Sequence, residues 1–138
     1  MSEENKVLSR RAWEEIVNQQ NLDAIDEIYT ADCVWHQPDQ DLQGSEQAWQ
    51  FLVMYLSAFP DTHVSVEDVI AEGDKVVTRI RLRGTHRAEL MGMAPTEKPI
   101  EVKGITIHRI EGDKIVEQWQ SHDDLGLMQQ IDTMAYVE

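Results

Sequence analysis

Apolar residues in the first part of the chain recur every three or four positions, which places them on one face of an α-helix. Three such runs predict helices over residues 5–20, 22–29 and 44–59. Pro60 ends the third run, because proline cannot donate the next backbone hydrogen bond. The apolar positions are Leu8, Ala12 and Ile16 in the first helix, Leu22, Ile25 and Ile28 in the second, and Ala48, Leu52, Tyr55 and Phe59 in the third. The sequence CVWHQP predicts a short extended segment between the second and third helices.

From Asp61 onward the apolar positions alternate with polar ones, a pattern typical of β-strands. The turn sequence EGDK occurs at residues 72–75 and again at 111–114, each time between two alternating runs. It therefore predicts two hairpins and at least four strands. The connection from His86 to Pro99 also contains Gly92 and Pro95, which predicts an irregular loop. Helices followed by antiparallel strands indicate an α+β fold, with a curved sheet wrapped around the helices.

Alternation also predicts the facing of side chains in the strand after the first EGDK turn. The inward set is Val76, Thr78, Ile80 and Leu82, and the outward set is Arg79, Arg81 and Arg83. A solvated face paired with acids explains the arginines better than an anion site does. His86 falls on the inward side if the alternation continues. The last two strands carry apolar residues on both faces, so the facing of His108 and His122 stays open.

Several segments together resemble one known family. They are NLDAIDEIYTADCVWHQP, AFPDTHVSVEDVIAEGDKVVTR, GTHRAELMGMAPTEKPIEVKGITIHRIEGDKIVEQW and DDLGLMQQ. In this order, over nearly the whole chain, they resemble the SnoaL-like polyketide or ester cyclases of the nuclear transport factor 2-like superfamily. The resemblance implies one domain over residues 1–138, with three N-terminal helices packed in a strongly curved, cone-like antiparallel sheet. It also implies a short C-terminal helix and an enclosed apolar pocket.

Members of that family close a ring by intramolecular aldol condensation, without a metal or an organic cofactor. The family pattern W-x-x-x-D-x-L-G assigns the catalytic acid/base to Asp123, four residues after Trp119. The family's GTH assigns a second catalytic residue to His86, and V-x-H-x-P assigns a ligand-binding residue to His36. One departure is His122, at a position where an apolar or aromatic residue is more usual in the family.

The residues themselves leave two interpretations of the pair Asp123 and Asp124 open. An acid before an apolar helix usually caps it, because the carboxylate accepts hydrogen bonds from the first turn. Asp124 directly precedes LGLMQQI and is the expected cap, which leaves Asp123 to point into the pocket beside Trp119. An apolar pocket would raise the pKa of a carboxyl group toward the range useful for proton transfer. Alternatively, Asp123 is itself a cap or a surface residue, and His86 and His36 have structural roles.

Large and adaptable side chains are candidates for lining the cavity, since methionine and aromatic residues fit irregular ligands. These ligand-binding candidates are Trp35, Met54, Tyr55, Met91, Met93 and Trp119. Packing in the core explains the same residues equally well.

The chain has 26 acidic and 12 basic residues among 138, giving a formal net charge of −14. This charge repels phosphate backbones and anionic lipid surfaces, so we expect neither nucleic acid nor membrane partners. The absence of a long apolar run or a signal-peptide pattern predicts a cytoplasmic location. Cys33 is the only cysteine and is expected to be a small buried side chain. No residue spacing fits a metal site, so we expect no metal and no cofactor.

Two functions are consistent with the sequence. The first is a cofactor-free enzyme that performs acid/base chemistry on a small apolar carbonyl compound, with isomerase, hydrolase or lyase chemistry as variants. The second is a noncatalytic module that binds a small hydrophobic ligand or dimerises, because this architecture hosts many functions. The two-sided apolar character of GITIHRI and IVEQW predicts a homodimer formed through the outer face of the sheet.

Overall fold

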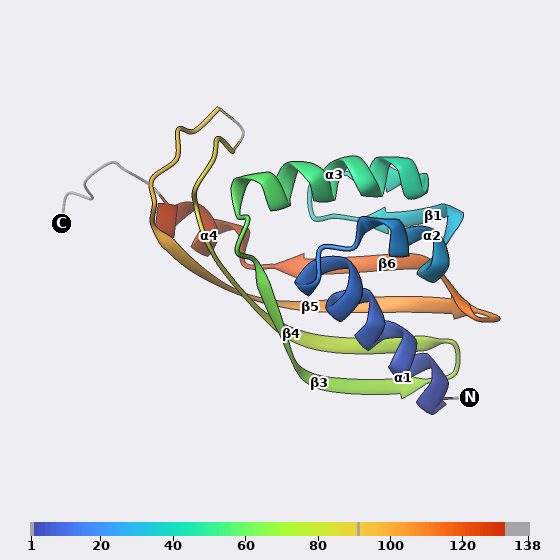
Figure 1. Cartoon of the computed structure of the whole chain (residues 1–138). Helices are drawn as coiled ribbons and strands as arrows, with labels where there is room; N and C mark the ends of the chain where they lie inside the picture. The colour runs from blue at the N-terminus through green and yellow to red at the C-terminus, as the bar shows by residue number, and fades with distance from the viewer. Residues whose placement is uncertain (1, 91, 132–138) are drawn as a thin grey trace.

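A strongly bent sheet forms the body of the molecule, and the N-terminal helices lie across one of its faces (Figure 1). The structure is a computed structural model, and it describes residues 2–90 and 92–131. Within these residues the sheet has six strands in the order β2-β1-β6-β5-β4-β3. The strands are β1 (Tyr29–His36), β2 (Asp41–Gln43), β3 (His63–Glu72), β4 (Lys75–Thr85), β5 (Pro99–Glu111) and β6 (Lys114–His122).

The predicted helices are confirmed, with differences in their local geometry. The first combines α1 (Ser2–Arg11) with a π-helical continuation, η1 (Ala12–Asn18). The second is a short 3₁₀ turn, η2 (Leu22–Ala24), followed by α2 (Ile25–Ile28), and the side chain of Asn21 makes no capping hydrogen bond. The remaining helices are α3 (Gly44–Ala58) and the C-terminal α4 (Asp124–Ile131).

Both predicted hairpins are present and use the EGDK sequences as their turns. Glu72 pairs with Lys75, and Glu111 pairs with Lys114, so each loop has two residues. Gly73 and Gly112 have φ values of +60° and +63°, a region that glycine enters without strain. The connection between β4 and β5 is irregular, as expected, and projects from one end of the sheet (Figure 1).

The sheet is not wholly antiparallel, because β1 runs parallel to β6 and antiparallel to β2. The sequence predicted the extended segment but neither β2 nor its partners. Helix α3 packs against β1, and α4 packs against β5. This arrangement sets Trp35 of β1 directly beside Gln118 of β6.

The inward face of β4 is buried in the predicted alternation, with Val76, Thr78 and Ile80 almost inaccessible to solvent. The outward arginines are paired with acids, as the solvated-face interpretation expects. Arg79 binds Asp68 at 2.6 Å, and the other pairs are Arg83 with Glu101 and Arg81 with Glu67 and Glu101. The polar face of this strand therefore needs no anionic ligand to balance its charge.

A β-bulge in β6 decides which of its side chains face inward. Ile110 pairs with Ile115, whereas the preceding Arg109 pairs with Glu117, so β6 has one extra residue at Val116. The bulge shifts the alternation by one position. Ile115 and Gln118 are therefore both buried, while Trp119 lies on the outer face.

Candidate active site

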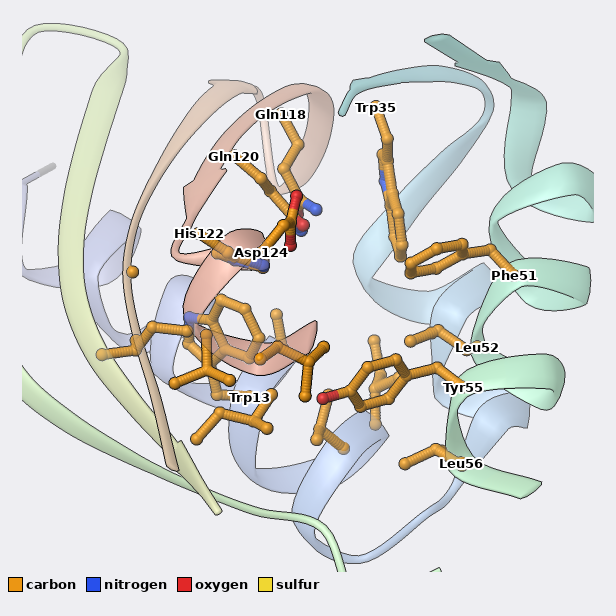
Figure 2. A pocket seen from close by; sticks show the side chains of 18 of the residues that line it. Trp13, Trp35, Phe51, Leu52, Tyr55, Leu56, Gln118, Gln120, His122 and Asp124 are labelled. Atoms are coloured by element: carbon orange, nitrogen blue, oxygen red, sulfur yellow. The ribbon is translucent and has the colours of Figure 1, made fainter. Parts of the chain in front are cut away.

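A cavity opens between the inner face of the sheet, the π-helix η1 and helix α3 (Figure 2). Most of its wall is apolar. The lining side chains from the helices are Ala12, Trp13, Ile16, Val17, Phe51, Leu52, Tyr55 and Leu56, and those from β1, β4, β5 and α4 include Trp35, Ile80, Leu82, Val102 and Leu127. Such a wall binds an apolar ligand by removing its surface from water.

One wall of the cavity is polar, and it follows β6 into α4. Gln118, Gln120 and His122 alternate along the strand and face inward, and Asp124 continues the row at the first position of α4. Figure 2 shows these four side chains on the side of the cavity opposite Phe51 and the other residues of α3. The pattern of the sequence does not reveal this row, because the bulge at Val116 decides which residues of QWQSHDD face inward.

The structure reverses the expected roles of the two consecutive aspartates. Asp123 Oδ1 accepts a hydrogen bond of 2.9 Å from the backbone N–H of Gly126, so Asp123 caps α4. Asp124 lines the cavity, and Asp123 does not. The physical reason is that α4 begins one residue earlier than the pattern suggested. The cap must lie three residues before the N–H that it binds, which makes Asp123 the capping residue.

Gly126 belongs to this capping arrangement. A Cβ atom added there would lie 2.6 Å from Asp123 Cγ and closer still to its Oδ2. Residue 126 is thus a glycine because the capping carboxylate of Asp123 occupies the space that a Cβ would fill. The same carboxylate is directed away from the cavity, since it is occupied at the end of the helix.

Asp124 is exposed to solvent although it lines the cavity, so it lies where the cavity meets bulk water. Burial raises the pKa of its carboxyl group, and the charges of Asp39 and Asp123 raise it further, while nearby His122 lowers it. The raised pKa makes Asp124 a stronger base than an ordinary surface aspartate. Burial also raises the pKa of the Tyr55 hydroxyl on the opposite wall, and the charge of Asp124 adds to that effect.

His122 is the neighbour of Asp124 in the polar row. Burial lowers the pKa of its imidazole, against the opposing influence of Asp124. Its Nε2 is buried and has no hydrogen-bond partner within the described part of the chain. The ring fits because residue 104 is glycine: a Cβ there would overlap the imidazole and lie 3.1 Å from Ser121 O. His122 can therefore hold a proton or hydrogen-bond a ligand beside Asp124.

The interior end of the cavity contains a buried hydrogen-bonded network. Ser9 Oγ lies 2.8 Å from His108 Nδ1, and His108 Nε2 lies 2.7 Å from Gln118 Oε1. The Tyr29 hydroxyl also donates to Gln118 Oε1. Burial lowers the pKa of His108 to about 4, although its hydrogen bond with Gln118 acts in the opposite direction. His108 is therefore neutral at physiological pH.

The chain was compared with models of known protein families. The model of the SnoaL-like polyketide cyclases matches residues 7–131. The chain belongs to the SnoaL-like polyketide cyclase family. This confirms the resemblance found in the sequence, and a comparison with curated protein sequences finds no significant match.

Solved structures of similar proteins have the same cone-like fold. A candidate SnoaL-like polyketide cyclase from Jannaschia sp. CCS1 has a TM-score of 0.91 and 26% identity, covering 97% of this chain and 95% of its own. AclR, a candidate hydroxylase from Streptomyces galilaeus, has a TM-score of 0.87 and 26% identity, covering 98% and 100%. IdmH, a candidate polyketide cyclase from Streptomyces antibioticus, has a TM-score of 0.81 and 27% identity, covering 91% and 96%.

His86, which the family resemblance assigned to catalysis, is fully buried but does not line this cavity. Its Nδ1 lies 3.0 Å from Thr96 Oγ1 and accepts a hydrogen bond from the Thr96 backbone N–H at 3.3 Å. The ring packs against Phe59, with the ring centroids 5.5 Å apart and the planes tilted by 33°. These contacts hold the loop between β4 and β5, so the structure supports the structural alternative for His86.

His36 and Trp119, both expected in the pocket, lie together on the outer face of the sheet. Their rings stack with centroids 5.4 Å apart. His36 Nδ1 is 2.9 Å from Asp41, and Nε2 is 2.6 Å from Glu117. The hydrogen bond to Glu117 raises the pKa of His36, and the one to Asp41 raises it further. The bulge at Val116 turns Trp119 outward, and His36 faces outward because it follows the inward-facing Trp35 on β1.

The remaining candidates divide between the cavity and other surroundings. Trp35 and Tyr55 line the cavity, as predicted. Met54 is 40% exposed on α3, Met93 packs against the core outside the cavity, and Met91 lies outside the described residues. Cys33 is buried, and burial raises the pKa of its thiol to about 11, which opposes a nucleophilic role.

Residues 2–90 and 92–131 contain no group of three or more histidine, cysteine, aspartate or glutamate side chains arranged to hold a metal ion. In the same residues, no helix is long and apolar enough to cross a membrane.

Proposed function

We propose that this family member is an acid/base enzyme acting on a small apolar carbonyl compound, with Asp124 as the proton-transfer group. The observation that carries the proposal is the position of Asp124, whose carboxylate lines an apolar cavity beside a half-buried imidazole. Burial raises its pKa toward the range where one group can serve as base and then as acid. Asp123 is engaged in the helix cap and is not available for this role.

The proposed step is a proton transfer at a carbon next to a carbonyl group. Asp124 takes the proton, and the electrons of the C–H bond move onto the carbonyl oxygen to form an enolate. In an intramolecular aldol cyclisation, the enolate carbon attacks a second carbonyl of the same molecule. The protonated Asp124 then returns its proton to the new alkoxide, so the carboxylate is regenerated. A carboxylate in apolar surroundings can carry both transfers without a Lewis acid, so we expect activity to survive chelators.

The fold alone does not determine which reaction of this class the protein catalyses. Relatives with the same architecture are named as candidate cyclases and as a candidate hydroxylase. The competing proposal is a noncatalytic module that uses the apolar cavity to bind a small hydrophobic ligand. The exposure of Asp124 favours this alternative, because contact with water keeps the basicity of a carboxylate closer to that of an ordinary aspartate.

The two proposals can be separated by measuring proton abstraction directly. Methyl benzoylacetate, a small aromatic β-keto ester, is incubated in D₂O with the protein, and loss of its α-hydrogen signal is followed by NMR. We expect Asp124→Asn to slow the catalysed exchange by roughly two to four orders of magnitude, the usual contribution of an acid/base group. Asp123→Asn is the matched control, since asparagine also caps helices and should keep the rate. A wild-type rate no faster than the buffer background would favour the binding module, and equal catalysed rates in both variants would exclude Asp124 as the base.

We also propose a homodimer formed through the outer face of the sheet. Ile70 and Ile105 are 64% and 48% exposed there, and Ile107 and Trp119 pair across neighbouring strands. Contiguous apolar surface of this kind is typical of a protein interface. Sedimentation equilibrium should give about twice the chain mass of 15.9 kDa at micromolar concentration. Ile107→Glu should return the protein to the monomer, and a wild-type monomer would contradict the proposal.

A further inference from the structure

The hydrogen bonds of the buried network fix the orientation of one side chain that lines the cavity. Gln118 is 2% exposed, and its carbonyl oxygen Oε1 is the common partner of His108 Nε2 and the Tyr29 hydroxyl. A carbonyl oxygen has two lone pairs and accepts two hydrogen bonds. Both are used here, which leaves the amide NH₂ of Gln118 as the group free to face the cavity.

The opposite orientation of the amide would leave a buried hydrogen without an acceptor. If the NH₂ of Gln118 donated to Tyr29 and His108, the hydroxyl hydrogen of Tyr29 would need another partner. The hydroxyl contacts only Gln118 and His108 Nε2 among the described residues, and that nitrogen would already be occupied. In the observed orientation, His108 carries its proton on Nε2, and its Nδ1 accepts from Ser9. The polar hydrogens of Ser9, Tyr29 and His108 are then all satisfied, and only the NH₂ of Gln118 is directed to the cavity.

A second donor, the indole N–H of Trp35, lies next to Gln118. Trp35 is its register partner on β1, and the indole lines the same cavity (Figure 2). Trp35 Nε1 is buried and has no hydrogen-bond partner in residues 2–90 and 92–131. A buried N–H without an acceptor is destabilising. Two donors from neighbouring strands thus face the same apolar cavity, and the described residues supply no acceptor for the indole. This arrangement matches a ligand that brings an oxygen acceptor with it.

We infer that Gln118, together with Trp35, forms a subsite for a carbonyl oxygen at the interior end of the cavity. The inference deepens the proposed function and rests on it for the statement that the ligand is a substrate. Gln118 is buried, whereas Asp124 lies at the opening, so proton transfer and acceptor binding occur at different depths. The substrate is thus an apolar carbonyl compound that enters with one carbonyl first. Tyr29 and His108 are positioning residues, since they act through Gln118.

Equilibrium binding of two matched ligands tests the subsite. Acetophenone and ethylbenzene have similar shapes, but only acetophenone has an oxygen acceptor. Each is titrated into ¹⁵N-labelled protein, with the tryptophan indole and glutamine amide signals followed by NMR. We expect the ketone to bind about five to ten times more tightly, the range of one net hydrogen bond, and to shift both sets of N–H signals. Equal affinities, or tighter binding of 1-phenylethanol than of acetophenone, would overturn the inference.

Two variants test whether the preference for the ketone comes from the amide of Gln118. Gln118→Met keeps the length of the side chain and removes the donor, so the preference for the ketone should fall to near unity while ethylbenzene affinity is retained. Tyr29→Phe removes one of the two bonds that orient the amide, and it should reduce the preference without changing ethylbenzene binding. A purely structural role would weaken both ligands equally. A Gln118→Met protein that folds and keeps the full preference would refute the subsite.

These tests are independent of turnover. If Gln118→Met fails to fold, Tyr29→Phe and the amide shifts of the wild-type protein still decide the orientation of Gln118. Asp124→Asn should keep the ketone preference, because it alters proton transfer at the opening and not the interior subsite. Loss of exchange in Asp124→Asn with no ketone preference in the wild type would therefore support the proposed function while excluding the subsite. The reverse result would support a carbonyl-binding module.

Discussion

The two faces of the sheet around β6 each hold a histidine that is hydrogen-bonded to neighbouring polar side chains. The pKa values of these two histidines are shifted in opposite directions. Inside, His108 bonds only to neutral groups, and burial lowers its pKa to about 4. Outside, His36 bonds to Glu117 and Asp41, and these carboxylates raise its pKa. The difference shows that the partners and the solvent, more than the residue type, set the charge of a histidine. The neutral network around His108 fixes the orientation of the Gln118 amide. The charged network around His36 is an ordinary cluster of surface ion pairs.

The largest expected effect concerns pH. The folded-state pKa of His108 lies below its unfolded value of about 6.5, so the unfolded chain binds more protons between about pH 4 and 6.5. This histidine therefore contributes stability above pH 6.5 that is lost as the pH falls toward 4, on the order of 3 kcal/mol. Urea unfolding of wild type and His108→Leu across this range should show a steeper slope in the wild type, with the remaining slope due to groups such as His122, whose pKa is also lowered. The same slope in both proteins would contradict the assignment.

His36 should give the opposite sign. Its folded pKa lies above the unfolded value, so its contribution is complete below about pH 6.5 and is lost as the pH rises through the folded pKa. His36→Gln should flatten the pH dependence above pH 6.5, and it should also weaken the acid limb, because His36 is the main cause of the lowered pKa of Glu117. Because the pairs are partly exposed, the loss at neutral pH should be under about 1 kcal/mol. An unchanged alkaline limb would show that the surface network carries no such linkage.

The next expected effect compares consecutive residues on the two faces. Gly104 faces inward against His122, so Gly104→Ala should force the imidazole to move and lower the unfolding free energy by about 1–3 kcal/mol. Lys103 faces solvent, and Lys103→Ala should change the unfolding free energy by less than about 0.5 kcal/mol. Thermal and urea unfolding of both variants test the pair. Equal values would mean that the inner face repacks freely around His122.

A further effect is expected at the junction where β6 becomes α4. Asp123→Ala should lose about 1 kcal/mol, the usual value of a cap. Gly126→Ala should be destabilising by a similar amount in the wild type, because the new Cβ displaces the capping carboxylate. In the Asp123→Ala background, however, Gly126→Ala should stabilise the helix, since alanine is the better helix former. A double-mutant cycle measures this change of sign, and additive effects would refute the link between the two residues.

The alternating and helical patterns were sufficient for most of the fold. The three N-terminal helices, both EGDK hairpins, the irregular loop and the inward face of β4 are all where the sequence predicted them. These features depend on local preferences and on a period that a single segment reveals by itself. The parallel pairing of β1 with β6 was not predictable in this way, because it joins residues about 80 positions apart.

The candidate site likewise has features that the sequence determines locally and features that depend on the tertiary structure. The sequence alone determined that an acid pair would follow the last strand, that one acid would cap the helix, and that Trp35 and Tyr55 were candidates for the cavity wall. Tertiary structure decided which acid faces the cavity, and it brought Gln118, His108 and Tyr29 together from three strands. A single extra residue at Val116 sets the phase of β6. Side chains alternate between faces at every step, so a shift of one residue exchanges the whole inward row for the outward one.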